Sequence, residues 1–133
     1  MKYFLDTNVI IDISRKKNEK IINHLLNTNP NDIFIPSIVI AELEFGARHS
    51  KDYKNNFEKI QKIIKPFKIV QFTELESYFY GIIRQQLTAS GTVIGSNDML
   101  IAATALANDG IIVTHNVREF SRINDLKVED WTE

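Results

Sequence analysis

The sequence predicts an α/β domain whose central sheet is mostly parallel and contains four to five strands. Short continuous apolar runs, typical of strands buried on both faces, recur along the chain. They alternate with segments in which apolar residues have helical spacing. Strands that alternate with helices favour βαβ units, which place the strands parallel. The 133 residues fit a single compact domain, residues 1–133.

The first half of the chain is expected to contain two strands and four helices. Tyr3-Phe4-Leu5 is the first apolar run, and Asp6 ends it. Prolines limit the helices that follow, because a proline interrupts the hydrogen-bond ladder, and Ser37 is a plausible N-cap. We expect strands at residues 3–5 and 33–35, and helices at residues 7–14, 19–27, 37–48 and 52–65.

The second half repeats the alternation. Residues 68–71 are predicted to form a strand, and Thr73 with Glu76 forms a capping box for the next helix. Asn97 is a plausible cap for a helix over residues 98–108, with Gly110 at the C′ position, which favours glycine. Strands at residues 111–114 and, with a weaker pattern, 126–128 complete the sheet.

Composition excludes several kinds of protein. The chain has no cysteine, which rules out disulfides, thiolate metal sites and thiol nucleophiles. The N-terminus lacks the apolar segment of a signal peptide, and no apolar run approaches a membrane helix, so we expect a cytoplasmic protein. The net charge of −1 argues against a large uniform positive field for nucleic acid but leaves room for a local basic groove.

Four acidic residues stand at positions that favour chemistry. Asp6 ends the first strand, Asp98 lies in the first turn of a helix, Glu119 follows the strand that ends at Thr114, and Glu42 lies in an apolar helical segment. In parallel sheets ligands bind at the carboxyl ends of the strands. We expect Glu42 to share an inward-facing stripe with Ile38 and Phe45, three to four residues away.

Each acid also has a purely structural interpretation. Asp6 could cap the first helix, Asp98 could be a first-turn acid favoured by the helix dipole, and Glu119 could close a capping box with the backbone N–H of Asn116. Only Glu42 is poorly explained, because an unpaired carboxylate on an apolar stripe is costly. Taken together, clustered carboxylates repel by roughly 1–4 kcal/mol per pair at about 4 Å. A cation would relieve this, and oxygen ligands favour Mg²⁺ or Mn²⁺.

Five short motifs occur in order along the chain: Leu5-Asp6-Thr7-Asn8, Ala41-Glu42-Leu43, Ile94-Gly95-Ser96-Asn97-Asp98, Ile101-Ala102-Ala103 and Val113-Thr114-His115-Asn116-Val117-Arg118-Glu119-Phe120. With the ending Leu126-Lys127-Val128-Glu129-Asp130-Trp131, this set resembles the PIN-domain nucleases and, more narrowly, the VapC toxins of bacterial toxin–antitoxin pairs. The likeness extends over essentially the whole chain.

The resemblance implies a PIN-like three-layer α/β/α domain and a Mg²⁺- or Mn²⁺-dependent endoribonuclease. It further implies a homodimer, a cognate VapB-type antitoxin and an RNA substrate, with initiator tRNA cut in the anticodon stem-loop as the preferred candidate. The family's acidic quartet maps onto Asp6, Glu42, Asp98 and Glu119. We expect these four side chains to bind metal and act in catalysis, and water attack to leave a 5′-phosphate and a 3′-hydroxyl.

Further residues are assigned supporting roles. We expect four polar side chains to orient the carboxylates, namely Thr7, Asn8, Thr114 and Asn116. The RNA contacts are expected at Arg15, Lys16, Lys17 and His115. For the lysines, a solvated helix face is the simpler alternative.

Two other functions remain open at this level. A phosphotransfer enzyme could use Asp6 as a nucleophile, although Asn8 stands where a phosphatase of that kind has a second Asp. A non-catalytic PIN-like domain could bind RNA or protein without cleaving it, although the intact acidic quartet argues against this. Trapping of a phosphoaspartate and a nuclease assay with Mn²⁺, respectively, would distinguish these alternatives.

Overall fold

A computed structural model describes residues 1–133 and confirms the predicted α/β class. Five strands form one sheet in the order β3-β2-β1-β4-β5, and every neighbouring pair is parallel. The sheet is therefore wholly parallel rather than mostly so. The strands are β1 Tyr3–Leu5, β2 Ile33–Pro36, β3 Lys68–Val70, β4 Ile111–Val113 and β5 Lys127–Glu129.

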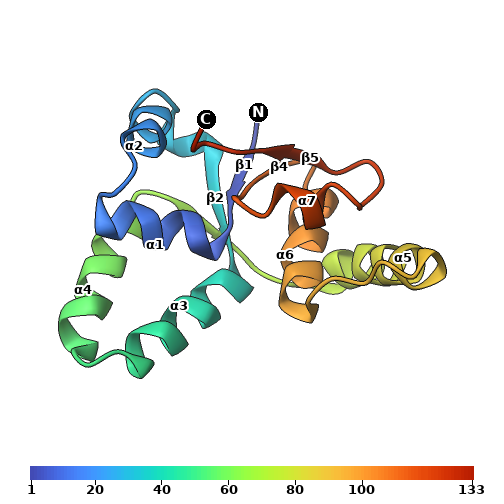
Figure 1. Ribbon diagram of the computed structural model, residues 1–133, viewed down its shortest axis with the longest axis horizontal. Coiled ribbons are helices and arrows are strands. Elements are labelled where there is room, and N and C mark those ends of the chain that lie inside the picture. Colours follow the sequence, from blue (N-terminus) through green and yellow to red (C-terminus); the bar gives the residue numbers. More distant parts are fainter.

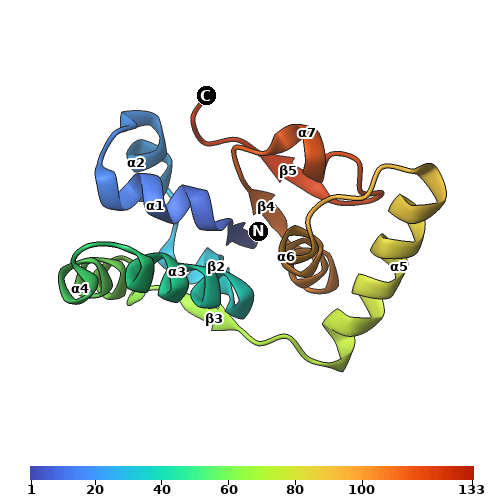
Figure 2. The same ribbon diagram turned by 60° about the horizontal axis from the view of Figure 1, so that its bottom comes forward.

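Helices cover both faces of this sheet. Figures 1 and 2 show α1 to α4 on one side of the strands and α5 to α7 on the other. The helices are α1 Thr7–Arg15, α2 Glu19–Leu26, α3 Ser37–His49, α4 Tyr53–Ile64, α5 Glu74–Ser90, α6 Ser96–Ala107 and the short α7 Val117–Phe120, with a single 3₁₀ turn at Pro30–Asp32. None of these helices combines the length and apolar character that a membrane crossing requires.

The two central strands explain where a site can form. β1 and β4 are neighbours, and Leu5 pairs with Val113, so both strands end at the same level of the sheet. Both strands are enclosed in the core, because Phe4, Leu5 and all three residues of β4 are buried. Asp6 and Thr114, each one residue past its strand, consequently lie side by side at the carboxyl edge.

Three predicted helix ends differ from the structure. Ser37 and Asn97 lie inside their helices rather than capping them, since Pro36 and Gly95 occupy the N-cap positions. Asp109 takes the left-handed C′ conformation expected of Gly110, with a φ of 53°. Gly110 is required for another reason: a Cβ there would lie 2.3 Å from two ring carbons of the buried Phe4.

The capping box of α5 is confirmed. The backbone N–H of Thr73 donates to Glu76 Oε1 at 2.7 Å, and Glu76 is buried. The Glu76 carboxylate also accepts a bond from the Asn108 side chain at 3.0 Å, which ties the start of α5 to the end of α6. These hydrogen bonds hold the pKa of Glu76 below its usual value despite burial, which acts in the opposite direction.

Candidate metal and nuclease site

Asp6 is the most buried of the four acids, with 4% of its surface exposed. Its Oδ1 accepts the backbone N–H of Thr7 at 2.8 Å, and its Oδ2 accepts the Thr114 hydroxyl at 2.7 Å. Asp6 also occupies the N-cap position of α1, which confirms its structural interpretation, while its role as a metal ligand stays a prediction. Burial raises the pKa of Asp6 and the nearby Glu42 charge adds to this, while the two hydrogen bonds act against the rise.

Glu42 is held at the edge of the site rather than in the core. Its Oε1 accepts the Thr7 hydroxyl at 2.6 Å, and its Oε2 accepts a long bond from Asn97 at 3.4 Å. The expected inward stripe is wrong: Phe45 is 69% exposed, and the buried face of α3 consists of Val39, Leu43 and Ala47. Glu42 instead faces an open hollow of about 600 Å³, which relieves the cost of burying its charge.

Asp98 is the one of the four acids whose pKa is strongly raised. It is half-buried in the first turn of α6 and forms no side-chain hydrogen bond or ion pair in this arrangement. Burial and the neighbouring carboxylates of Asp6, Glu42 and Glu119, in that order, raise the pKa of Asp98 to about 6. Asp98 is thus the acid to which the other three predicted acids are electrostatic neighbours.

Glu119 does not close the capping box that its spacing allows. The backbone N–H of Asn116 donates to the Thr114 hydroxyl at 2.9 Å instead. Glu119 Oε2 accepts the Asn116 side-chain amide at 3.1 Å. Thr114 and Asn116 therefore each donate a hydrogen bond to one of the predicted acids, Asp6 and Glu119, respectively.

The four carboxylates form a cluster whose chemistry fits a hard divalent cation. In the present arrangement no three acidic or histidine side chains converge tightly enough to hold an ion. Asp6 is fixed by two hydrogen bonds, whereas Glu42 and Glu119 have longer side chains that are hydrogen-bonded to Thr7 and Asn116, respectively. The raised pKa of Asp98 reflects negative charge that a cation would neutralise.

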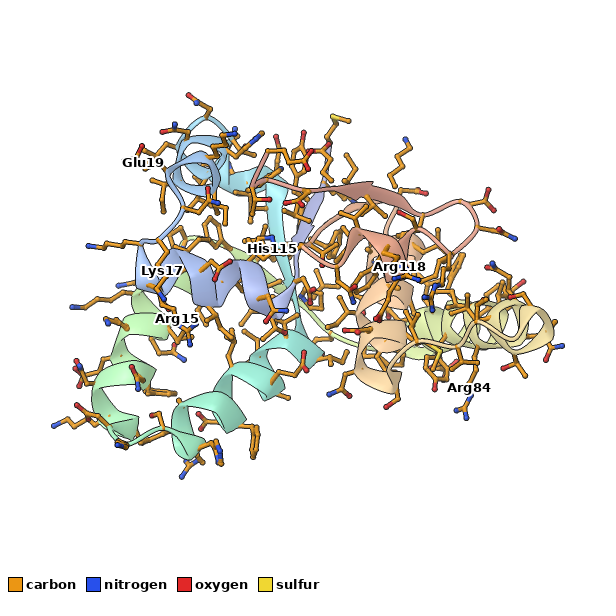
Figure 3. All side chains as sticks on the ribbon, in the orientation of Figure 1. Arg15, Lys17, Glu19, Arg84, His115 and Arg118 are labelled. Carbon is orange, nitrogen blue, oxygen red and sulfur yellow. The ribbon has the colours of Figure 1, made fainter.

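The predicted supporting and RNA-contact residues divide into separate groups. Thr7 contacts Glu42, but Asn8 is exposed and forms no side-chain hydrogen bond. Arg15 and Lys17 are exposed at the C-terminal end of α1, on the opposite side of the structure from Arg118 (Figure 3). Arg15 and Glu42 line the same cleft of about 240 Å³ between α1, α3 and α4.

The other two predicted RNA contacts, Lys16 and His115, lie outside this cleft. Lys16 ends α1 in the left-handed conformation and lines a hollow beside α2 and α4. The His115 ring lies at hydrogen-bond distance from Asp12 and faces Asp130.

Some residues near the site were not predicted from the sequence. Lys59 of α4 lines the same cleft as Arg15 and Glu42, and its place beside the apolar residues Phe57 and Ile60 could have indicated this. Asn97 was expected as a helix cap but instead contacts Glu42. Asp12 and Asp130 meet His115 across 103 and 15 positions, which no local pattern reveals.

Comparison with known proteins identifies the class to which this fold and site belong. The PIN domain family matches residues 3–126. The ribonuclease VapC2 of Rickettsia felis is 38% identical over 132 residues, which cover 98% of both chains. The tRNA(fMet)-specific endonuclease VapC of Salmonella typhimurium is 33% identical over 131 residues, again 98% of both chains. The chain therefore belongs to the PIN-domain family.

Solved structures agree with this assignment. The VapBC2 complex of Rickettsia felis bound to a DNA fragment from its promoter has a chain that matches with a TM-score of 0.92 and 37% identity, covering 98% of this chain and 99% of that one. The DNA-bound VapBC complex of Salmonella typhimurium matches with a TM-score of 0.92 and 33% identity over 98% of each chain. Within the PIN-domain family, the chain is a member of the VapC ribonucleases.

Proposed function

We propose that this VapC-type ribonuclease is a Mg²⁺- or Mn²⁺-dependent endoribonuclease and the toxin of a type II toxin–antitoxin pair. The observation that carries the proposal is the position of Asp6 where β1 and β4 end together, with the carboxylates of Glu42, Asp98 and Glu119 near enough for their charges to raise the pKa of Asp98. Such a cluster repels itself when empty, and a divalent cation is the natural counter-charge.

The four acids have different roles in this proposal. Asp6 and Asp98 hold the cation, and Glu119 completes the set directly or through water. A bound cation lowers the pKa of a water molecule and places positive charge against the scissile phosphate. Glu42 Oε1 is committed to Thr7, whereas Oε2 has only the long 3.4 Å bond from Asn97 and so can accept a proton from the attacking water. The products are a 5′-phosphate and a 3′-hydroxyl, because water rather than the ribose attacks.

The cleft between α1, α3 and α4 supplies a path for the RNA backbone. Glu42 lies in its lining together with Arg15 and Lys59, neither of which pairs with a carboxylate. Two free cations beside an acidic site lower the repulsion that phosphates would meet there. Lys16 and Lys17 extend this positive surface at the end of α1, in accordance with their predicted role as RNA contacts.

The expected protein partners are proposed on separate grounds. The structures of similar chains from Rickettsia felis and Salmonella typhimurium are VapBC complexes, so we propose a VapB-type antitoxin for this chain. We also propose a homodimer, since several large apolar side chains are exposed around α3 and α5, namely Phe45, Leu75, Tyr78 and Ile82. Light scattering on the purified toxin should give twice the monomer mass, and a monomer would contradict the dimer.

The preferred substrate is initiator tRNA. The relative from Salmonella typhimurium bears the name tRNA(fMet)-specific endonuclease, and it is 33% identical over nearly the full length. Mapping of RNA 5′ ends after expression of the toxin would test this. We expect new 5′-phosphate ends in the anticodon stem-loop of that tRNA, and cuts spread over messenger RNA would contradict the assignment.

The decisive test of the nuclease itself uses purified protein, an RNA substrate and two metal conditions. Cleavage should require Mn²⁺ or Mg²⁺, stop in EDTA, and disappear in Asp98→Asn and Asp6→Ala variants that keep their helical circular dichroism. Growth arrest on expression should follow the same pattern. A folded Asp98→Asn variant that still cuts RNA or arrests growth would refute the mechanism, and RNA binding without cleavage would favour a non-catalytic domain.

A further inference from the structure

His115 is tied to two carboxylates from distant parts of the chain. Its Nε2 lies 2.5 Å from Asp12 Oδ2 on α1, and its Nδ1 lies 3.5 Å from Asp130 Oδ1, directly after β5. The three side chains are only 25%, 30% and 20% exposed. The imidazole thus links α1, the turn after β4 and the C-terminal segment, close to the end of β1 (Figure 3).

Both ring nitrogens are directed at protein groups. Nε2 is engaged with Asp12, and Nδ1 is buried without a hydrogen bond of its own, 3.5 Å from the Asp130 carboxylate. Asp130 is in turn fixed by the backbone N–H and the hydroxyl of Thr132, at 2.9 Å and 2.6 Å. Because Nε2 is engaged and Nδ1 is buried, neither ring nitrogen is accessible to an RNA phosphate.

The segment that His115 anchors also orients two of the acids. Thr114 donates to Asp6 Oδ2 at 2.7 Å, and Asn116 donates to Glu119 Oε2 at 3.1 Å. The Asn116 backbone N–H, in addition, closes a bond to the Thr114 hydroxyl at 2.9 Å, so the three residues form one turn. Any movement of the His115 backbone would therefore shift both carboxylate partners together.

We propose that His115 is a positioning residue that holds the turn at residues 114–116 through its contacts with Asp12 and Asp130. By holding this turn, it sets the spacing of Asp6 and Glu119. The inference rests on the proposed metal site. Groups that orient metal ligands typically change metal affinity by about 10–100-fold when removed. His115 consequently acts on cation affinity, whereas a residue that contacts RNA would act on RNA affinity.

A metal titration without RNA separates these two roles. Thermal melts of His115→Asn over a range of Mn²⁺ concentrations should show a stabilisation midpoint about ten-fold higher than that of the wild type. The KM for a fluorescent RNA oligonucleotide at saturating Mn²⁺ should stay within about two-fold of the wild-type value. The matched control is His24→Asn, because His24 is an exposed helical histidine that stacks on Trp131 and does not contact the site.

A second variant guards against simple misfolding. Asp12 is half-buried on α1 and its only side-chain hydrogen bond is with His115, so Asp12→Ala removes one end of the tie without a substitution in the turn itself. It should raise the Mn²⁺ midpoint in the same direction. The double variant with His115→Asn should be no worse than the more impaired single variant, because both changes break one interaction.

The outcomes that overturn the proposal are distinct. If His115→Asn leaves the Mn²⁺ midpoint unchanged and raises the KM for RNA, His115 is an RNA contact instead. If both quantities stay at wild-type values, the tie serves stability alone. If the wild-type protein shows no stabilisation by Mn²⁺, the metal site itself is refuted; a normal wild-type response with a normal His115→Asn response refutes only the positioning role.

Discussion

Replacement of Asp98 by Asn should make the metal-free protein more stable while it removes nuclease activity. Asp98 is half-buried with no hydrogen-bond partner, and burial together with three acidic neighbours raises its pKa to about 6 from an ordinary 3.8. A carboxyl group whose pKa is raised by folding binds its proton more tightly in the folded state. Its ionised form therefore destabilises the folded state above the folded-state pKa. This loss of stability disappears as the pH falls toward the pKa of the unfolded state.

The size of the effect follows from the shift. A rise from 3.8 to about 6 corresponds to about 3 kcal/mol at neutral pH. Solvent screening at a half-buried group and the lost interaction with the dipole of α6 both reduce this gain, so we expect a net increase of about 1–2 kcal/mol. For a domain of this size that corresponds to roughly 4–8 °C in Tm.

The assay is a pair of thermal melts in EDTA, at about pH 7 and about pH 4. Asp98→Asn should melt higher than the wild type at the first pH and nearly equally at the second. Asp125→Asn provides the control, because Asp125 is an exposed acid far from the site, and its left-handed backbone suits Asn. Equal melting of wild type and Asp98→Asn at neutral pH would refute the mutual repulsion on which the proposed site depends.

Three further substitutions test neighbouring features. Thr114→Val should cost about 1–3 kcal/mol in urea unfolding, because it removes the hydroxyl that donates to buried Asp6; unchanged stability would show that this bond contributes little. Glu119→Gln should keep the fold but lower cleavage and raise the Mn²⁺ requirement, and full activity at limiting metal would give Glu119 a structural role only. Gly110→Ala should cost about 1–3 kcal/mol through its clash with Phe4, measured by urea unfolding, with specific activity of the folded protein unchanged.

Much of the fold was accessible from the sequence because the relevant signals are local. Apolar runs marked all five strands, and helical spacing together with prolines placed six of the helices within a few residues. The capping box at Thr73 and Glu76 was also readable, since it depends on a spacing of three residues. The short α7 was not among the predicted helices, although Asn116, the suggested start of a capping box, does occupy its N-cap position; the box itself does not form.

The errors have a common physical origin in contacts between distant segments. Gly110 resembles a helix-terminating glycine, yet the nearness of Phe4, more than one hundred positions away, is what requires it. Glu42 and Phe45 have the spacing of an inward stripe, but whether a stripe of α3 faces the core or an open hollow depends on how the helix is packed. The partners of His115 likewise depend on the order of strands in the sheet.

The strand order has a consequence for how the protein folds while it is being synthesised. β1 is synthesised before the other strands, but it pairs with β4 on one of its two edges. That pairing can form only after residues 111–113 have been made. Thr114 and Glu119 arrive later still, so a nascent chain holds at most three of the four acids and lacks the hydroxyl that orients Asp6. The complete set of four acids, together with the hydroxyl that orients Asp6, therefore exists only once residue 119 has been made.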